Sequence, residues 1–222
     1  MLANLALNPQ LAGRISPLHA AAADSEGELT LYQHRREPLY NTTVPGAGAG
    51  GVAAAPDVWA LLQGSGALGG VGAGAAGEVS RLADGGAWRT TRVRSAPLDR
   101  LLSDAQIRTA RLVKVDVEGG EWAVLQGARR LLADGPESLE VVVEVTPKWL
   151  SMSGVSVSRL FAHMAVFGFH PYLLAAESYE VAHSLPPPPP PPPPQRLRTG
   201  ELGRDFKQAD IIFSRRDVEW LD

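Results

Sequence analysis

The segment 111–145 constrains this chain more than any other part of the sequence, because a buried strand, an acidic turn, a helix and a second buried strand follow one another there. Residues 111–117 (RLVKVDV) and 139–145 (LEVVVEV) have the apolar composition of buried strands. Residues 121–134 (EWAVLQGARRLLAD) carry apolar side chains at helical spacing, and Gly135-Pro136 ends the predicted helix. Strand, helix and strand in this order indicate an α/β fold.

The remaining pattern continues this alternation. Strands are predicted at 15–22, 29–32, 88–94, 171–176 and 209–215, and helices at 2–12, within 96–104 and at 157–168. The length of 222 residues suits one domain with one core. We therefore expect residues 1–222 to form a single α/β domain built around a mainly parallel sheet.

Two segments depart from this pattern and are predicted to be insertions. Residues 45–77 are mostly Gly and Ala with almost no charge, so they offer little large apolar surface to bury. Residues 185–204 contain nine consecutive prolines at 186–194. Such a run favours a polyproline II rod of about 28 Å, at ~3.1 Å per residue, which SH3, WW or profilin-like domains could bind.

Composition excludes several classes of function. The 21 Lys and Arg against 24 Asp and Glu give a net charge of −3, too little positive charge for a nucleic-acid-binding surface. Cysteine is absent, which excludes disulfides, a cysteine nucleophile and thiolate metal sites. No apolar run is long enough to span a bilayer, and the start of the chain does not read as a secretory signal. A cytoplasmic location is the default expectation.

Acidic side chains gather where the two buried strands end. Asp116, Glu118 and Glu121 follow the first strand, and Glu144 lies at the end of the next. Ligands of open α/β sheets bind outside the carboxyl ends of the strands, so these residues are candidates for a site. Asp116, Glu118 and Glu121 could instead hold a hard cation, or Glu121 could serve only as a helix-start acid. Glu144 belongs either to the site or to the surface.

The acidic turn and its surroundings resemble a known family. Asp-Val-Glu-Gly-x-Glu at 116–121, Val-Leu-x-Gly-Ala at 124–128 and the Val-rich strand ending in Glu144 are similar to the FkbM family of S-adenosylmethionine-dependent methyltransferases. Weaker matches follow the family's order, and they include the segments 4–8, 17–21, 24–32, 97–99, 168–169 and 209–213.

This resemblance implies a Rossmann-like methyltransferase sandwich with a mainly parallel sheet and an antiparallel C-terminal strand. It also implies methyl transfer from S-adenosylmethionine to an oxygen of a small molecule or glycan. His19 and Ala20 would then lie near the adenine, and Asp116 near the sulfonium and the acceptor. Asp116 and Glu118 become the catalytic candidates, Glu144 a candidate on the substrate side, and no metal is required. A carboxylate there could accept the proton of an attacking hydroxyl.

The sequence also departs from the family. The family's first strand, its Gly-rich cofactor loop and the acid that ends its second strand are not found, so the sheet is expected to lack its first two strands. A truncated chain, an inactive homologue and a missing half supplied by another chain remain open explanations. A function of a different class also remains open, namely a catalytically inactive interaction protein that presents its proline segment to a partner domain.

Overall fold

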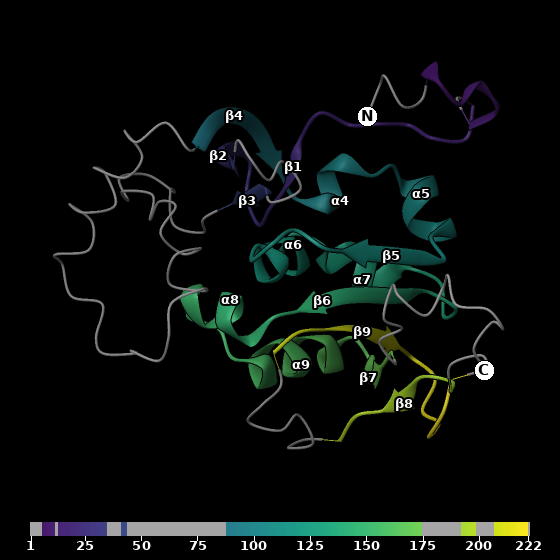
Figure 1. Ribbon diagram of the computed structural model, residues 1–222. Helices are drawn as coiled ribbons and strands as arrows, with labels where there is room; N and C mark the ends of the chain where they lie inside the picture. The colour runs from purple at the N-terminus through teal and green to yellow at the C-terminus, as the bar shows by residue number, and fades with distance from the viewer. Residues whose placement is uncertain are drawn as a thin grey trace, which may run out of the picture.

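The computed structural model describes residues 6–11, 13–34, 41–43, 88–174, 192–198 and 207–221. Its elements form two sheets and a set of short helices (Figure 1). In chain order they are η1 (Pro9–Leu11), β1 (Ala21–Ala22), β2 (Gly27–His34), β3 (Asn41–Thr43), β4 (Trp88–Ala96), α4 (Leu98–Leu101), α5 (Asp104–Thr109), β5 (Leu112–Val115), α6 (Glu121–Gln126), α7 (Arg129–Asp134), β6 (Glu140–Val145), α8 (Pro147–Met152), α9 (Val157–Val166), β7 (His170–Leu173), β8 (Gln195–Arg196) and β9 (Ala209–Ser214).

The first sheet has the order β1-β4-β2-β3. Its centre is the long antiparallel pair of β2 and β4, in register from Gly27 opposite Ser95 to His34 opposite Trp88. The predicted strands at 29–32 and 88–94 are therefore confirmed, and they pair with each other. Of the segment 15–22, only Ala21 and Ala22 are in a strand, parallel to the end of β4. Residues 15–19 are exposed, so the expectation of a buried strand there was wrong.

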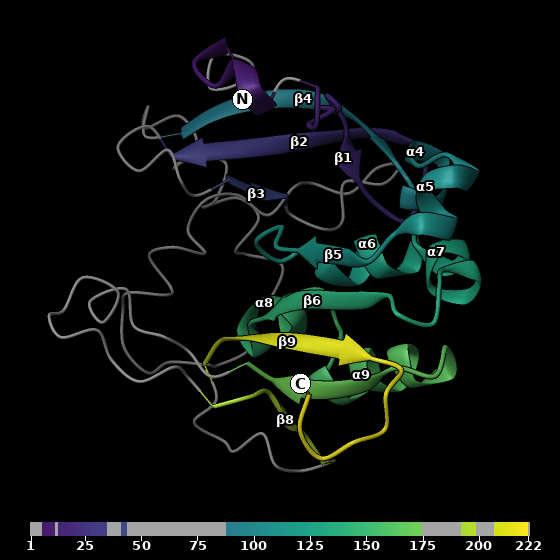
Figure 2. The ribbon, with the colours of Figure 1, turned by 90° about the vertical axis from the view of Figure 1, so that its right-hand side faces the viewer.

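The second sheet has the order β5-β6-β9-β7-β8 and lies below the first in Figure 2, with α6, α8 and α9 behind it. The pair of β5 and β6 is parallel, as expected. The strand β9 is antiparallel to both of its neighbours, which confirms the expected antiparallel C-terminal strand. Because β9 lies between β6 and β7, the sheet's hydrogen-bonded pairs are mostly antiparallel. In direction, however, β5, β6 and β7 all run the same way, because β6 and β7 are both antiparallel to β9. These three strands agree with the expected parallel set, and the Rossmann-like arrangement of the whole sheet stays a prediction.

The main core lies between the second sheet and its helices. Alternation along β6 buries every second side chain, and Val141, Val143 and Val145 face this core. The predicted helix at 157–168 is confirmed as α9, whose Leu160 and Met164 are fully buried against the sheet. Val142 lies on the opposite face of β6 from these valines and packs against a smaller cluster of Tyr172, Ile212 and Leu221. Apolar side chains therefore pack on both faces of β6.

The predicted single helix at 121–134 is in fact two short helices, α6 and α7. The reason is a tertiary contact with α4, which contains Asp99. The carboxylate of Asp99 accepts hydrogen bonds from the backbone N–H groups of Arg130, at 2.7 Å, and Leu131, at 3.0 Å. These bonds supply the helix start of α7 with partners from outside the helix. The N–H of Asp99 in turn donates to the carbonyl of Gly127 at 3.1 Å.

Several expectations fall wholly or partly outside the described residues. The Gly/Ala-rich segment 45–77 and most of the proline segment 185–204 lie there, so their prediction as insertions stays a prediction. The predicted helix at 2–12 is described only from residue 6, and its described part contains the short 3₁₀ helix Pro9–Leu11. The single-domain organisation and the absence of two strands also remain predictions. No helix within the described ranges is long and apolar enough to cross a membrane.

Gly127 is predicted to be required at the break between α6 and α7. A Cβ atom there would lie 1.9 Å from the carbonyl oxygen of Ala23 and 3.0 Å from the Cα of Pro97. Both contacts are with backbone, which cannot rotate away. Gly127→Ala is expected to lower the free energy of unfolding by about 1–3 kcal/mol or more, measured by denaturant unfolding. Gly13→Ala is the matched control, because nothing lies within 4 Å of its added Cβ. Equal stability of the two variants would contradict this account.

Candidate functional site

The end of β5 leads directly into the acidic turn that opens α6. Strand pairing stops at Val115, and Asp116 follows with its side chain partly exposed. Glu118 has φ of 52° and is the one non-glycine residue with positive φ among those described. Gly119 follows with φ of 106°. An ordinary side chain in the left-handed region costs about 1–2 kcal/mol, so other contacts must hold this turn.

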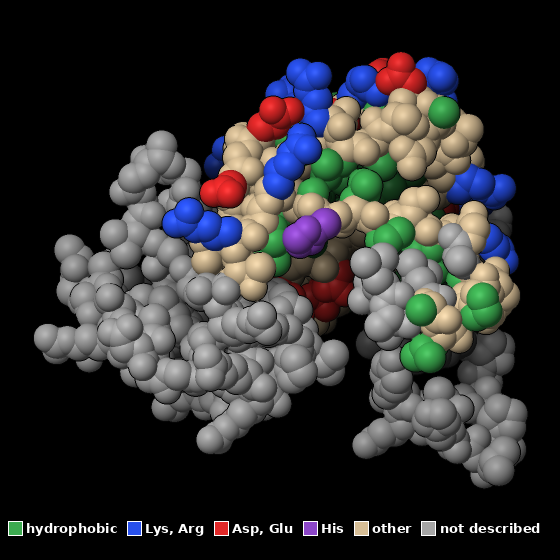
Figure 3. All heavy atoms as spheres, turned by 90° about the horizontal axis from the view of Figure 1, so that it is seen from above, with side chains coloured by type: hydrophobic (Ala, Val, Ile, Leu, Met, Phe, Trp, Pro, Cys, Tyr) green, Lys and Arg blue, Asp and Glu red, His purple; other side chains and the backbone are tan. Residues whose placement is uncertain are grey.

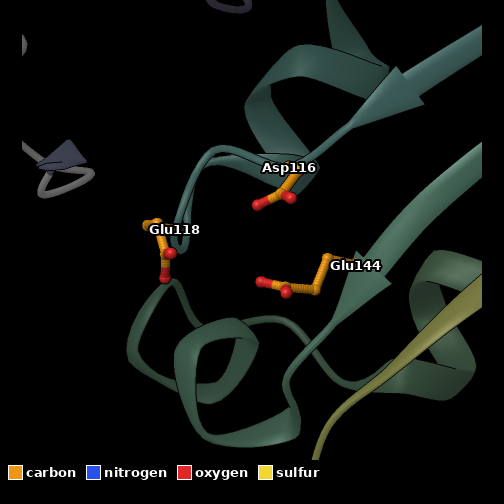
Figure 4. Close-up of side chains that lie close together, drawn as sticks. All are labelled: Asp116, Glu118 and Glu144. Atoms are coloured by element: carbon orange, nitrogen blue, oxygen red, sulfur yellow. The ribbon is translucent and has the colours of Figure 1, made fainter. Parts of the chain in front are cut away.

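Three of the predicted acids come together at this edge of the sheet. Carboxylate oxygens of Asp116, Glu118 and Glu144 all lie within 4.8 Å of one another. Figure 4 shows the three groups around a shared space, with Asp116 after β5, Glu118 in the turn and Glu144 near the end of β6. The parallel pairing of β5 and β6 explains the arrangement, because it places both carboxyl ends side by side. The predicted gathering of acids is therefore confirmed for these three residues.

Polar neighbours that the sequence analysis did not single out surround this cluster. Lys114 Nζ lies 3.2 Å from Asp116 Oδ2 and 3.7 Å from Asp210 Oδ2. Asp210 stands opposite Glu144 in the register of β6 and β9. Gln208 Nε2 donates a hydrogen bond to Glu144 Oε1 at 2.5 Å. Of these three residues, the sequence could have indicated only Lys114, because it lies two residues before Asp116 and strand residues two apart share a face.

Burial and like charge change the proton affinity of these acids. Burial, and then the neighbouring Glu144 and Asp116, raise the pKa of Glu118 from 4.5 to about 7. Burial and Asp116 also raise the pKa of Glu144, while the hydrogen bond from Gln208 acts in the opposite direction. The hydrogen bond to Asp116 raises the pKa of Lys114. Glu118 therefore exchanges its proton near neutral pH.

Glu121 has a different role from the one a metal site would give it. Its side chain is buried, and one carboxylate oxygen accepts hydrogen bonds from the N–H groups of Val117, at 3.3 Å, and Gly119, at 3.0 Å. Burial raises the pKa of Glu121, and these N–H bonds lower it. The alternative of a cation held by Asp116, Glu118 and Glu121 was therefore wrong in its third member, because Glu121 faces the backbone of the turn.

The two adenine-side candidates directly precede β1 of the first sheet, whereas the acidic cluster follows strands of the second sheet. His19 is exposed, and Ala20 is half-buried immediately before β1 in the first sheet. Their role in cofactor binding stays a prediction.

The surface is hollowed at the side of the molecule seen in Figure 3. Hydrophobic side chains line the wall of this hollow, and acidic side chains lie deep within it. A cationic or hydroxyl-bearing molecule suits such a lining, because carboxylates attract positive charge and accept hydrogen bonds from O–H groups. The spacing of the three acids is also compatible with a cation, but acidic groups often lie so without one.

Comparison with known proteins assigns a family to this region. Residues 62–171 match the family described as the methyltransferase FkbM domain. The matched stretch includes β5, the acidic turn, α6 and β6, which carry the whole cluster of Asp116, Glu118 and Glu144. No curated protein and no solved structure matches the chain. The family indicated by the acidic turn is thus confirmed, and the chain carries an FkbM methyltransferase domain.

Proposed function

We propose that this domain transfers a methyl group from S-adenosylmethionine to a hydroxyl oxygen of a small molecule or glycan. The observation that supports this most is the meeting of Asp116, Glu118 and Glu144 at the carboxyl ends of two parallel strands inside an FkbM domain. Such an edge is where α/β folds bind their ligands. One of its acids, Glu118, has a pKa of about 7, which suits a general base.

The donor set of the cluster is compatible with the cofactor. S-adenosylmethionine carries a positive sulfonium and, when bound, supplies an activated methyl group. Asp116 is the residue proposed to face the sulfonium, because it follows β5 directly and its carboxylate is partly exposed. The ion pair with Lys114 orients that carboxylate. His19 and Ala20 are proposed to contact the adenine, as the family resemblance implies.

Glu118 is proposed to take the proton of the acceptor hydroxyl. A base with a pKa near the working pH is deprotonated often enough to act and still holds the proton that it receives. Glu144 is proposed to bind a hydroxyl of the acceptor, with Gln208 fixing its carboxyl group. Correct placement of the acceptor hydroxyl contributes much of the rate in displacements of this kind.

The interaction-protein alternative depends on the proline segment. Only its last prolines, at 192–194, are among the described residues, and Pro194 accepts a hydrogen bond from the N–H of Leu221 at 3.0 Å. This contact ties the end of the segment to the C-terminal part of the chain. Binding of a partner domain by these prolines stays a prediction.

Cofactor binding gives the first test. Isothermal calorimetry on the 222-residue chain is expected to show binding of S-adenosylmethionine. Asp116→Asn is expected to weaken it by about tenfold or more, since a charge interaction of ~1.4 kcal/mol corresponds to a factor of ten. Asp134→Asn is the matched control, because Asp134 is exposed near the end of α7. Absence of binding by the folded chain would contradict the proposal for this chain.

Turnover tests the proposed base. Labelled S-adenosylmethionine is offered with hydroxylated small molecules and oligosaccharides, and methyl transfer is followed. Glu118→Gln is expected to lower kcat/KM by about 10²-fold or more. The rate of the unmodified chain is expected to rise with pH up to a plateau above about 7, because the base must lose its proton first. Glu137→Gln, at an exposed acid, serves as the control. An unchanged rate in Glu118→Gln would remove Glu118 from the mechanism.

Thermal melting tests the same group without an acceptor. The pKa of Glu118 is about 7 in the folded chain against 4.5 for an unperturbed Glu, so the folded state keeps its proton where the unfolded state has lost it. The Glu118 contribution to stability is therefore lost as pH rises from 4.5 to about 7. The melting temperature of Glu118→Gln minus that of the unmodified chain is expected to increase as the pH rises from 4.5 to about 7 and to stay constant at higher pH. A difference independent of pH would show that Glu118 titrates normally.

A further inference from the structure

The turn that carries Glu118 is held from inside and from outside. From inside, the Glu121 carboxylate binds the N–H groups of Val117 and Gly119. From outside, the contacts come from α8 and the residue that follows it. A Cβ placed on Gly119 would lie 3.4 Å from Cε3 and 3.6 Å from Cβ of Trp149, so the indole lies directly against the Gly119 backbone. Ser153 Oγ donates a hydrogen bond to the carbonyl of Gly119 at 3.3 Å.

The location of α8 makes these contacts more than general packing. α8 begins at Pro147, immediately after the strand that carries Glu144. One short segment therefore supplies both Glu144 and the two side chains that contact Gly119. Gly119 is the residue next to Glu118, and both have positive φ. Movement of this turn relative to α8 would change the separation of Glu118 and Glu144.

We propose that Trp149 and Ser153 are positioning residues, which act through Gly119 to hold the carboxyl group of Glu118 beside Asp116 and Glu144. This inference deepens the proposed function, since it assigns to α8 the placement of the proposed base. Trp149 provides a rigid surface against which the left-handed turn rests. Ser153 fixes the orientation of the peptide that follows Glu118–Gly119. The burial and like charge that Glu118 experiences then depend on these contacts.

The test measures the proton affinity of Glu118 directly. Protein labelled with ¹³C-glutamate is titrated by NMR, and the Glu118 carboxyl signal is identified by its loss in Glu118→Gln. In Trp149→Ala the pKa of Glu118 is expected to fall from about 7 toward 4.5, because the turn can move away from Glu144 and Asp116. Trp149→Phe is expected to restore most of the value. Phe167→Ala, which removes a half-buried ring that contacts His163, is expected to leave it unchanged.

Kinetics provide the second measurement. Trp149→Ala is expected to lower kcat by about 10- to 100-fold with KM nearly unchanged, as small misplacements of reacting groups do. Ser153→Ala is expected to shift the Glu118 pKa in the same direction by less, and it replaces Trp149→Ala if that variant does not fold. An unchanged Glu118 titration in folded Trp149→Ala, or in Ser153→Ala in its place, would overturn the inference. If the pKa moves as expected while the unmodified chain transfers no methyl group, the positioning role stands and the proposed function fails.

Discussion

The parallel hydrogen bonding of β5 with β6 is the interaction on which the rest of the site depends. It aligns Leu112 with Glu140 and Val115 with Val143, so both strands reach the same edge of the sheet. Asp116 and Glu144 are brought together there, although they are far apart in the sequence. Apolar burial stabilises the arrangement, because the alternate valines of β6 lie in the main core. The acids themselves repel one another, and so the core must hold them in place.

The turn after β5 adds a second unfavourable contribution to the free energy of folding, and local contacts offset it. Glu118 adopts a left-handed backbone conformation and places a carboxyl group beside two others. Lys114 supplies the nearby positive charge, and the buried Glu121 satisfies two N–H groups of the turn. Residues that follow β6 hold the same turn from outside. Strain and like charge gathered at one place are typical of functional sites, because only the surrounding structure can maintain them.

The local sequence pattern predicted strands and helices correctly where residues close together in the sequence determine the structure. The strands β2, β4, β5, β6 and β9 and the helix α9 lie where apolar alternation or helical spacing predicted them. The acidic turn was located from its own residues, and its carboxylates converge as expected. The local pattern gave a wrong prediction where a contact with a distant segment of the chain determines the structure. The helix at 121–134 is divided because Asp99 caps α7 and Gly127 contacts the backbone of Ala23. The sequence of the helix itself contains no sign of either partner.

The sequence by itself determined which segments become strands and helices and where the acids stand along them, because these features follow from side-chain spacing within a few residues. It also determined the family, through the motif at 116–121. Only the tertiary structure decided that residues 27–34 pair with 88–96 in a separate sheet and that Glu144, rather than Glu121, completes the cluster. It also decided that the pKa of Glu118 lies near neutral. Strand pairing, desolvation and charge proximity depend on distances in space between groups that the chain order does not place together.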